Sequence, residues 1–235
     1  MNTSQIIEEN EKSIILIDIQ KSVNSMSTVS IRGTGFIISK DGKFITCAHV
    51  YNMIPSEDLG LIGASVPSKT DEKGILHYNR YPIELIDKDD KNDIALMQIV
   101  SDKKDFNYIK DFGEIEKTKA GEDLLFIGYP LATELLSSGF GITMTSTRCI
   151  ISSIKRRGID GSLDFFIVDT HANNGSSGSP VFSSETGKVM GLVSGKVFSA
   201  KIPNPDTKQI IEIPANMGIC RPAEYISEII NKNSK

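Results

Sequence analysis

The sequence predicts an all-β protein from three features: strand-like runs, turn residues between them, and little helical periodicity. Short runs rich in β-branched and aromatic residues recur along most of the chain, as is typical of strands. Gly, Asn, Asp and Pro separate these runs, for example at Asp41-Gly42 and Pro203-Asn204-Pro205. Many short strands with few helices favour barrels or a sandwich over alternating βαβ units.

The first and last expected elements are helices, a short one over residues 4–11 and an amphipathic one that begins at Pro222. Between them, the expected strands cover residues 13–20, 29–39, 43–46, 81–86, 93–100, 123–128, 141–154, 163–169, 181–182, 188–198 and 209–213. Residues 101–121 are polar and charged and lie between two strand-rich halves, so a linker is expected there, with an ordinary surface loop as the alternative.

Composition limits the class of protein. The 235 residues carry 26 Lys and Arg against 30 Asp and Glu, a formal net charge of −4. The length suits one or two domains with a substantial core, and 39% hydrophobic with 24% charged residues excludes collagen-like and disordered chains. The slight excess of acidic residues argues against a nucleic-acid-binding protein, which usually carries an excess of basic ones. No run of roughly 18 uncharged apolar residues, the length of a membrane-spanning helix, occurs in the sequence. Neither nucleic acid nor a membrane is therefore an expected partner.

The cysteines and the N-terminus predict the compartment. Three cysteines, Cys47, Cys149 and Cys220, cannot all pair, and none lies in a CxxC spacing. Cys47 follows an apolar run and is expected to be buried, as free thiols usually are. The N-terminus lacks a basic segment followed by a long apolar run, so no signal peptide is expected. Without a disulfide framework, these features predict a reducing, cytoplasmic location.

The segment Asn173–Val181 carries the strongest chemical signal. It reads Asn-Asn-Gly-Ser-Ser-Gly-Ser-Pro-Val, and such crowding of small residues around a serine permits tight turns that aim amide N–H groups at one point. Acyl transfer needs that arrangement, because an oxyanion develops beside the nucleophile. An ordinary Gly/Ser turn between strands is the alternative interpretation.

Two earlier segments favour the catalytic interpretation. Thr46–Val50 ends an apolar strand with His49, where a general base would be accessible. Asp93 stands at the start of a second apolar run, and an aspartate there can hold an imidazole in one tautomer and stabilise its charged form. The order along the chain is thus His, Asp and Ser.

At this point the sequence resembles the chymotrypsin-like (trypsin-like) serine peptidases, and within them the bacterial HtrA-type and glutamyl-endopeptidase-like branches. The matching segments are Gly33–Ser39, Thr46–Val50, Asn92–Leu96, Gly128–Leu131, Asp169–Val181, Gly191–Gly195 and Asn216–Ile219. Each motif is moderately specific, and the strength of the resemblance lies in their order over nearly the whole chain. Only a helix is expected after the protease-like region, without the PDZ domains of full HtrA proteins.

The resemblance implies two antiparallel six-stranded β-barrels with short terminal helices. The first barrel, residues 1–110, would carry His49 as general base and acid and Asp93 as the orienting carboxylate. The second, residues 118–235, would carry Ser177 as the nucleophile. No cofactor is implied, and the expected partner is a protein or peptide substrate.

The resemblance also implies how the substrate is held. The backbone N–H groups of Gly175 and Ser177 would form the oxyanion hole. The substrate-binding strand would comprise Ser194, Gly195 and Lys196, and the specificity pocket would include His171 and Ala172. A pairing of His171 with Lys196 would favour an acidic side chain before the scissile bond.

Two departures from the family pattern bear on activity. Ser176 replaces the common Asn or Asp before the nucleophile, and Ser179 replaces the second Gly of the usual Gly-Asn-Ser-Gly-Gly-Pro. The change at Ser176 could leave the oxyanion loop collapsed until an activating protein partner binds. A catalytically silent peptide-binding or scaffold module is the alternative function.

Other sites are weaker candidates. The α/β-hydrolase order, Ser before acid before His, is excluded because all three histidines precede Ser177. The near-fingerprint Gly33–Ile38 has no following helix pattern, so it is interpreted as a strand rather than a dinucleotide site. No HExxH or EF-hand pattern predicts a metal site, and His77 is expected to be a bystander.

Overall fold

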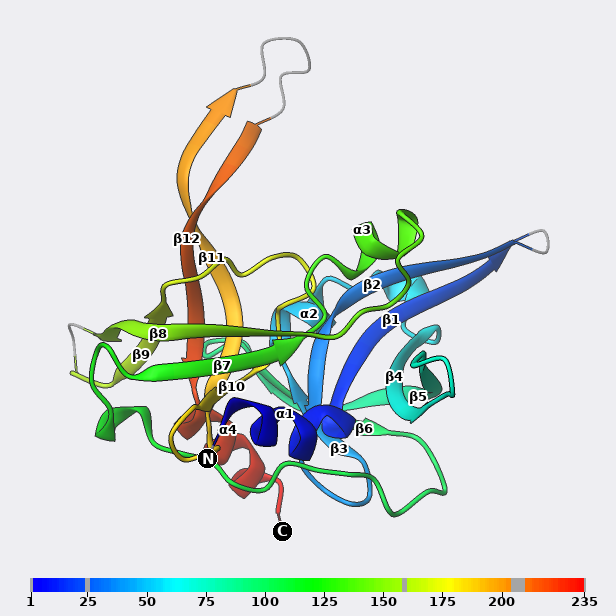
Figure 1. The fold of residues 1–235 in the computed structure, drawn as a ribbon, viewed down its shortest axis with the longest axis horizontal. Coiled ribbons are helices and arrows are strands. Elements are labelled where there is room, and N and C mark those ends of the chain that lie inside the picture. The colour runs from blue at the N-terminus through cyan, green and yellow to red at the C-terminus, as the bar shows by residue number, and fades with distance from the viewer. Residues whose placement is uncertain (1, 24–25, 158–159, 204–209, 235) are drawn as a thin grey trace.

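The computed structural model describes residues 2–23, 26–157, 160–203 and 210–234 (Figure 1). The first six strands are β1 (Ile14–Val23), β2 (Met26–Ile37), β3 (Lys43–Thr46), β4 (Ile62–Thr70), β5 (Leu76–Asp89) and β6 (Ile94–Ile99). The next six are β7 (Asp123–Gly128), β8 (Thr145–Arg156), β9 (Leu163–Val168), β10 (Pro180–Ser183), β11 (Val189–Pro203) and β12 (Ile210–Pro222). The α-helices are α1 (Thr3–Asn10), α2 (Ala48–Asn52), α3 (Ala132–Ser137) and α4 (Ala223–Lys232).

The strands close into two antiparallel β-barrels. The first has the order β1-β2-β3-β6-β5-β4 and the second β10-β11-β12-β9-β8-β7. The expected six-stranded double barrel and both terminal helices are therefore confirmed. Residues 101–121 connect β6 to β7 and thus one barrel to the other, while Phe106 and Ile109 of this segment are buried.

Several elements differ from the expectation, including helix α3, which the sequence analysis did not predict. The sequence analysis missed β4, whose run Ile62–Thr70 includes Gly63 and Pro67, two residues that disfavour strands. It also missed α2, because the five helical residues are too few to show a helical period. Finally, β11 and β12 continue well past the barrel as a two-stranded ribbon, which projects from the body in Figure 1.

Strand β7 joins the two hydrophobic cores. Leu124 and Phe126 belong to a cluster that fills the second barrel, whereas Leu125 and Ile127 belong to a larger cluster shared with the first barrel. Because side chains alternate across a strand, β7 is apolar on both faces and fits between the two cores. The large shared cluster holds the barrels together, which fixes the relative position of groups carried by each.

Helix α4 completes the shared core from the outside. Its Ala223, Ile226 and Ile229 are buried in the same cluster that contains residues of the first barrel. None of the helices in the described residues is long and apolar enough to cross a membrane.

Candidate active site

Helix α2 positions His49. The helix follows β3 directly, and His49 is its second residue rather than the last residue of a strand, as the sequence had suggested. Backbone N–H groups in the first turn of a helix have no partner within the helix. The N–H of His49 instead donates to Oδ1 of Asp93 over 2.9 Å, so the aspartate fixes the backbone of the histidine.

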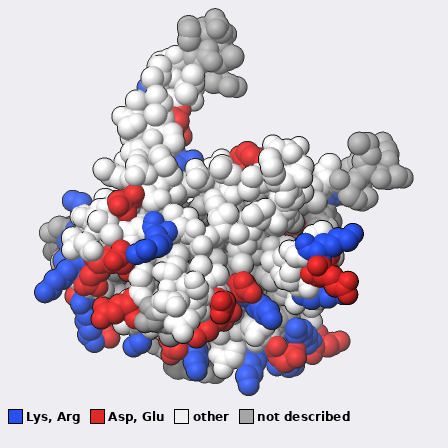
Figure 2. All heavy atoms as spheres, viewed as in Figure 1, with Lys and Arg blue, Asp and Glu red and all other residues white. Residues whose placement is uncertain are grey.

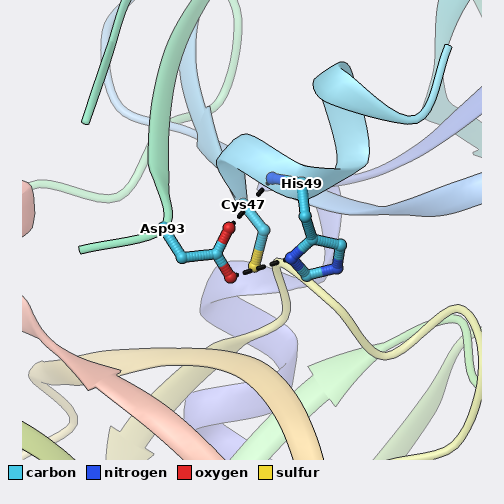
Figure 3. Close-up of side chains that lie close together, drawn as sticks. All are labelled: Cys47, His49 and Asp93. Carbon is cyan, nitrogen blue, oxygen red and sulfur yellow. Dashed lines mark hydrogen bonds and ion pairs between the residues drawn. The ribbon is translucent and has the colours of Figure 1, made fainter. Parts of the chain in front are cut away.

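Asp93 also contacts the imidazole ring. Nδ1 of His49 lies 2.8 Å from Oδ2 of Asp93, as the dashed line in Figure 3 shows. The same oxygen accepts a 2.5 Å hydrogen bond from the hydroxyl of Ser194, on β11 of the second barrel. With Nδ1–H donating to the carboxylate, Nε2 is the ring nitrogen that can accept a proton.

The contacts of Asp93 determine its charge state. Burial would raise the pKa of this carboxyl, but the hydrogen bond from the His49 ring, the charge of His49 and the hydrogen bond from Ser194 outweigh burial and lower the pKa. Asp93 therefore remains a carboxylate at neutral pH. Its backbone has φ +57°, a left-handed conformation that aspartate tolerates better than most residues and that lets the turn before β6 present the side chain.

Cys47 is the third polar side chain of this cluster. Ligand atoms of Cys47, His49 and Asp93 lie within 4.8 Å of one another, so a metal ion is a possible occupant to test. Burial, followed by the charge of Asp93, raises the pKa of the Cys47 thiol well above its usual value. The thiol donates to the carbonyl of Val193 over 3.3 Å. The thiol thus bonds to a backbone carbonyl and the carboxylate to the imidazole and to Ser194, so hydrogen bonds within the protein account for the cluster.

The loop that carries Ser177 is held by both barrels. From the first barrel, the N–H of Thr34 donates to the carbonyl of Ser177 over 2.8 Å. On the second-barrel side, the N–H of Gly178 donates to the carbonyl of Val193 over 2.7 Å, next to Ser194. The structure records no hydrogen bond between the Ser177 hydroxyl and the His49 ring. Such bonds are often long in unliganded enzymes and shorten when substrate binds.

Among the described residues, the backbone N–H groups of Gly175 and Ser177 donate no hydrogen bond. The carbonyl of Asn174 accepts from the N–H of Leu131 over 2.7 Å, and the carbonyl of Ser176 accepts from Ser179 over 2.9 Å. In a trans peptide the N–H points opposite to the carbonyl. The N–H groups of Gly175 and Ser177 therefore point away from those partners.

Thr34, which the sequence analysis did not single out, anchors this loop most directly. Its fully buried hydroxyl donates to the carbonyl of Gly175 over 2.7 Å and accepts from the N–H of Tyr129 over 3.1 Å. Its carbonyl accepts from the hydroxyl of Thr46 over 2.7 Å. No pattern in the sequence distinguishes Thr34 from other strand threonines, because its partners lie far away along the chain.

The glycines of the loop leave no space for a side chain. Gly178 has φ +89°, and a Cβ atom there would lie 1.9 Å from the carbonyl oxygen of Thr34. Gly175 has φ +90°, and a Cβ atom would lie 2.2 Å from the carbonyl oxygen of Tyr129. Both positions thus require glycine for backbone conformation and for close approach.

The expected substrate-binding residues are only partly brought together. Lys196 donates to the side chain of Asn174, in the loop that carries Ser177, over 3.1 Å. His171 is exposed, and its combination with Lys196 as a positively charged pocket wall stays a prediction. Ala172 is buried in the second-barrel core. The hydroxyl of Ser194 serves Asp93, a role that the sequence analysis had not assigned.

His77 lies apart from this site. It is exposed and bonds to Asp71 at 3.0 Å, in keeping with the expected bystander. The motif Gly33–Ile38 lies mostly in β2, as expected of a strand.

Comparisons with known proteins agree with this geometry. Residues 33–192 match the family described as "Trypsin-like peptidase domain". A "Probable periplasmic serine endoprotease DegP-like" of Bartonella henselae is 32% identical over 190 residues, 77% of this chain and 32% of that protein. A relative of the same name from Brucella suis is 29% identical over 191 residues, with the same coverage. The chain thus spans about a third of the length of these relatives.

A solved structure supports the fold. The structure titled "Crystal structure of Deg5" aligns with a TM-score of 0.64 at 18% identity, and the alignment covers 96% of this chain and 90% of that one. At this identity the likeness concerns the fold.

The expectation of a cytoplasmic location is contradicted, because the relatives are named periplasmic proteins. The cysteine argument failed for a physical reason. All three cysteines are buried, and burial raises the pKa of Cys149 to about 12 and that of Cys220 well above its usual value. Buried, protonated thiols resist oxidation in any compartment, so their unpaired state does not indicate a reducing one.

The expected resemblance is confirmed by the extent of the family match and by the identity of the relatives, which support a serine-protease hydrolase. The chain belongs to the trypsin-like peptidase domain family.

Proposed function

We propose that the chain is a serine endopeptidase in which Ser177, His49 and Asp93 form a catalytic triad. The observation that carries this proposal is the Asp93 carboxylate, which bonds at once to the ring and backbone of His49 and to Ser194 beside the Ser177 loop. The unbonded N–H groups of Gly175 and Ser177 are the proposed oxyanion hole.

Each group has a defined part in the reaction. His49 takes the hydroxyl proton of Ser177 through Nε2 as Ser177 Oγ attacks the scissile carbonyl carbon, while Asp93 stabilises the imidazolium that forms. The oxyanion hole accepts the negative charge of the tetrahedral intermediate. His49 then protonates the leaving amine, and a water molecule activated by His49 hydrolyses the acyl-enzyme.

We propose that the substrate is a protein or peptide that binds as an extended strand beside Ser194, Gly195 and Lys196. Strand addition suits this place, because main-chain groups of β11 supply the hydrogen bonds. His171 and Ala172 are the proposed wall of the specificity pocket. We also propose that the chain divides into two domains, residues 1–110 and 118–235. The names of the relatives support a periplasmic location.

Active-site labelling tests the proposal. A fluorophosphonate probe is expected to label the wild type, and Ser177→Ala is expected to abolish labelling. Asp93→Asn is expected to slow labelling by about 10⁴-fold, the scale known for triads with a disrupted orienting carboxylate. Labelling of Ser177→Ala equal to that of the wild type would contradict the assignment.

The same assay separates the alternative functions. If labelling of the wild type requires added cell extract, the enzyme is switched on by a protein partner. If the folded protein is never labelled and cleaves no member of a peptide library, it is a silent binding module. Peptide-library profiling also tests the pocket, since an acidic preference before the scissile bond would support a role for His171.

A further inference from the structure

The ribbon formed by β11 and β12 has an open edge that begins at the proposed nucleophile. On the edge away from β12, β11 pairs with β10 as far as Leu192. At Val193, the carbonyl accepts from Gly178 and the N–H donates to Ser179, at 2.7 and 2.9 Å. From Ser194 to Pro203, β11 pairs only with β12 among the described residues. The open edge therefore continues from the Ser177 loop along the whole ribbon.

We call the projecting part of this ribbon the arm, residues 197–203 and 210–217. Cross-strand partners share a face, so Ile202 and Ile211 lie together, and so do Ala200 and Ile213 on the same face. Ile202 and Ile211 are each 49% exposed, and Ile213 is 41% exposed.

The opposite face of the arm carries a polar pair. Lys201 and Glu212 are cross-strand partners joined by an ion pair of 2.7 Å. In Figure 2 the charged side chains gather over the body, while the projecting arm is mostly white on the face in view. The arm thus combines an open edge, an uncovered apolar face and a charged face.

We propose that the arm binds the part of the protein substrate that precedes the cleaved segment, as a third strand on the open edge of β11. This inference rests on the proposed function. Continuity of the edge carries it, because β12 is the only described strand that pairs with β11 from Ser194 to Pro203. The β11–β12 register shifts between Lys196 and Ala200, and a peptide that starts at Ser194–Lys196 and follows β11 through this bend lies along residues 197–203. A third strand also stabilises an isolated two-stranded ribbon, which is marginal in water.

The direction of the bound segment follows from the fold. β11 runs away from Ser177 toward the tip of the arm, and its pairs in the barrel are antiparallel. An antiparallel substrate runs from the tip toward Ser177, so its residues before the scissile bond occupy the arm. Ile202 is six residues beyond Lys196, roughly 20 Å along a strand.

The apolar face defines the class of substrate. Every second side chain of an added strand lies on the same face as Ile202 and Ile211 and covers them. The arm therefore selects extended segments with alternating apolar residues, a pattern that folded proteins bury and unfolded ones expose.

Two peptides that share the same cleavage sequence and differ in length test this inference. The short peptide reaches only Ser194–Lys196, and the long one carries about eight further upstream residues in which Val alternates with Thr. The extension is expected to raise kcat/KM of the wild type about tenfold or more. A third peptide with N-methylated alternate amides in the extension is expected to lose that gain, because it cannot pair with the edge.

Matched variants locate the effect on the arm. The double substitution Ile202→Ser and Ile211→Ser is expected to remove the gain from the extension and to leave cleavage of the short peptide unchanged. Glu212→Gln, on the opposite face, is expected to keep the gain. Circular dichroism checks that the variants are folded, and the N-methylated peptide gives the same test without altering the protein.

Several results would overturn the inference. One is equal kcat/KM for the long and short peptides with the wild type. Another is an equal gain from the N-methylated extension. A third is concentration-dependent self-association that the double substitution abolishes, without a gain from the extension, since the arm would then join two copies of the chain.

Failure of the proposed function gives a different result. In that case neither peptide is cleaved and Ser177 is not labelled. The affinity of the long, short and N-methylated peptides for Ser177→Ala, measured by fluorescence anisotropy, still decides the inference. Tighter binding of the long peptide alone supports the arm, and equal binding of all three overturns it.

Discussion

The nucleophile loop and the arm differ in how strongly the rest of the molecule fixes them. Thr34, Leu131 and Val193 bond to backbone groups of the loop from three directions, and two of its glycines have no room for a Cβ atom. The arm is held chiefly by the pairing of β11 with β12, and the side chains of its isoleucines are exposed. The contrast teaches that the proposed chemistry lies where the fold tolerates little change, whereas the proposed substrate selection lies where a substitution costs little stability.

The largest expected effect comes from a side chain in the loop. Gly178→Ala is expected to lower the free energy of unfolding by about 3 kcal/mol or more and to abolish labelling of Ser177, because the added Cβ atom meets the Thr34 carbonyl at a positive φ. Chemical denaturation measures the loss. Gly195→Ala is the matched control, since a Cβ atom at Gly195 has no neighbour within 4 Å, and unchanged stability is expected there.

A smaller effect is expected at the anchor of the loop. Thr34→Val removes a hydroxyl that two backbone groups use, so we expect a loss of about 1–3 kcal/mol in unfolding free energy and slower labelling. Thr34→Ser keeps the hydroxyl and is expected to retain most of the labelling rate. Equal labelling rates for the Val and Ser variants would show that the hydroxyl does not position the loop.

The pH dependence of stability tests the contacts of Asp93. Because the folded pKa is lowered, these contacts contribute fully above the unfolded value of about 3.9, and the contribution is lost as pH falls through the lower folded pKa. Unfolding free energies measured from pH 6 down to acid should therefore fall more steeply for the wild type than for Asp93→Asn. Parallel curves would contradict the lowered pKa.

The smallest effect is expected on the arm. Ile213→Ser is expected to change the unfolding free energy by less than about 0.5 kcal/mol, since the side chain is exposed and contacts no core cluster. Ile127→Ser, in the shared core, should by contrast cost several kcal/mol, about 3 or more. A large loss at Ile213 in thermal unfolding would mean that the arm packs against the body.

The sequence predicted those features that depend on local pattern or on a family motif. β3 and β7 were predicted with their observed bounds, because each is a short apolar run between turn residues. The pairing of His49 with Asp93 followed from the resemblance and is present.

Features that depend on distant contacts were not predicted. β4 forms because β1 and β5 pair with it, which outweighs the low strand propensity of Gly63 and Pro67. The role of Thr34 arises only once β2 meets a loop 141 residues away. The pocket wall proposed for His171 and Lys196 stays a prediction, because it depends on side-chain directions that a sequence does not contain. In the structure Lys196 bonds to Asn174.

The contacts of the Asp93 carboxylate couple the proposed activity to the docking of the two barrels. One of its oxygens accepts hydrogen bonds from His49 in the first barrel and from Ser194 in the second. The group proposed to orient the base therefore also links the two barrels. In the proposed triad, separation of the barrels removes the bond from Ser194 and parts Ser177 from His49, whereas both bonds between His49 and Asp93 stay within the first barrel. Activity is therefore expected to be lost before either barrel unfolds. Partly unfolded molecules of such a peptidase would lose proteolytic activity and would not cleave other proteins.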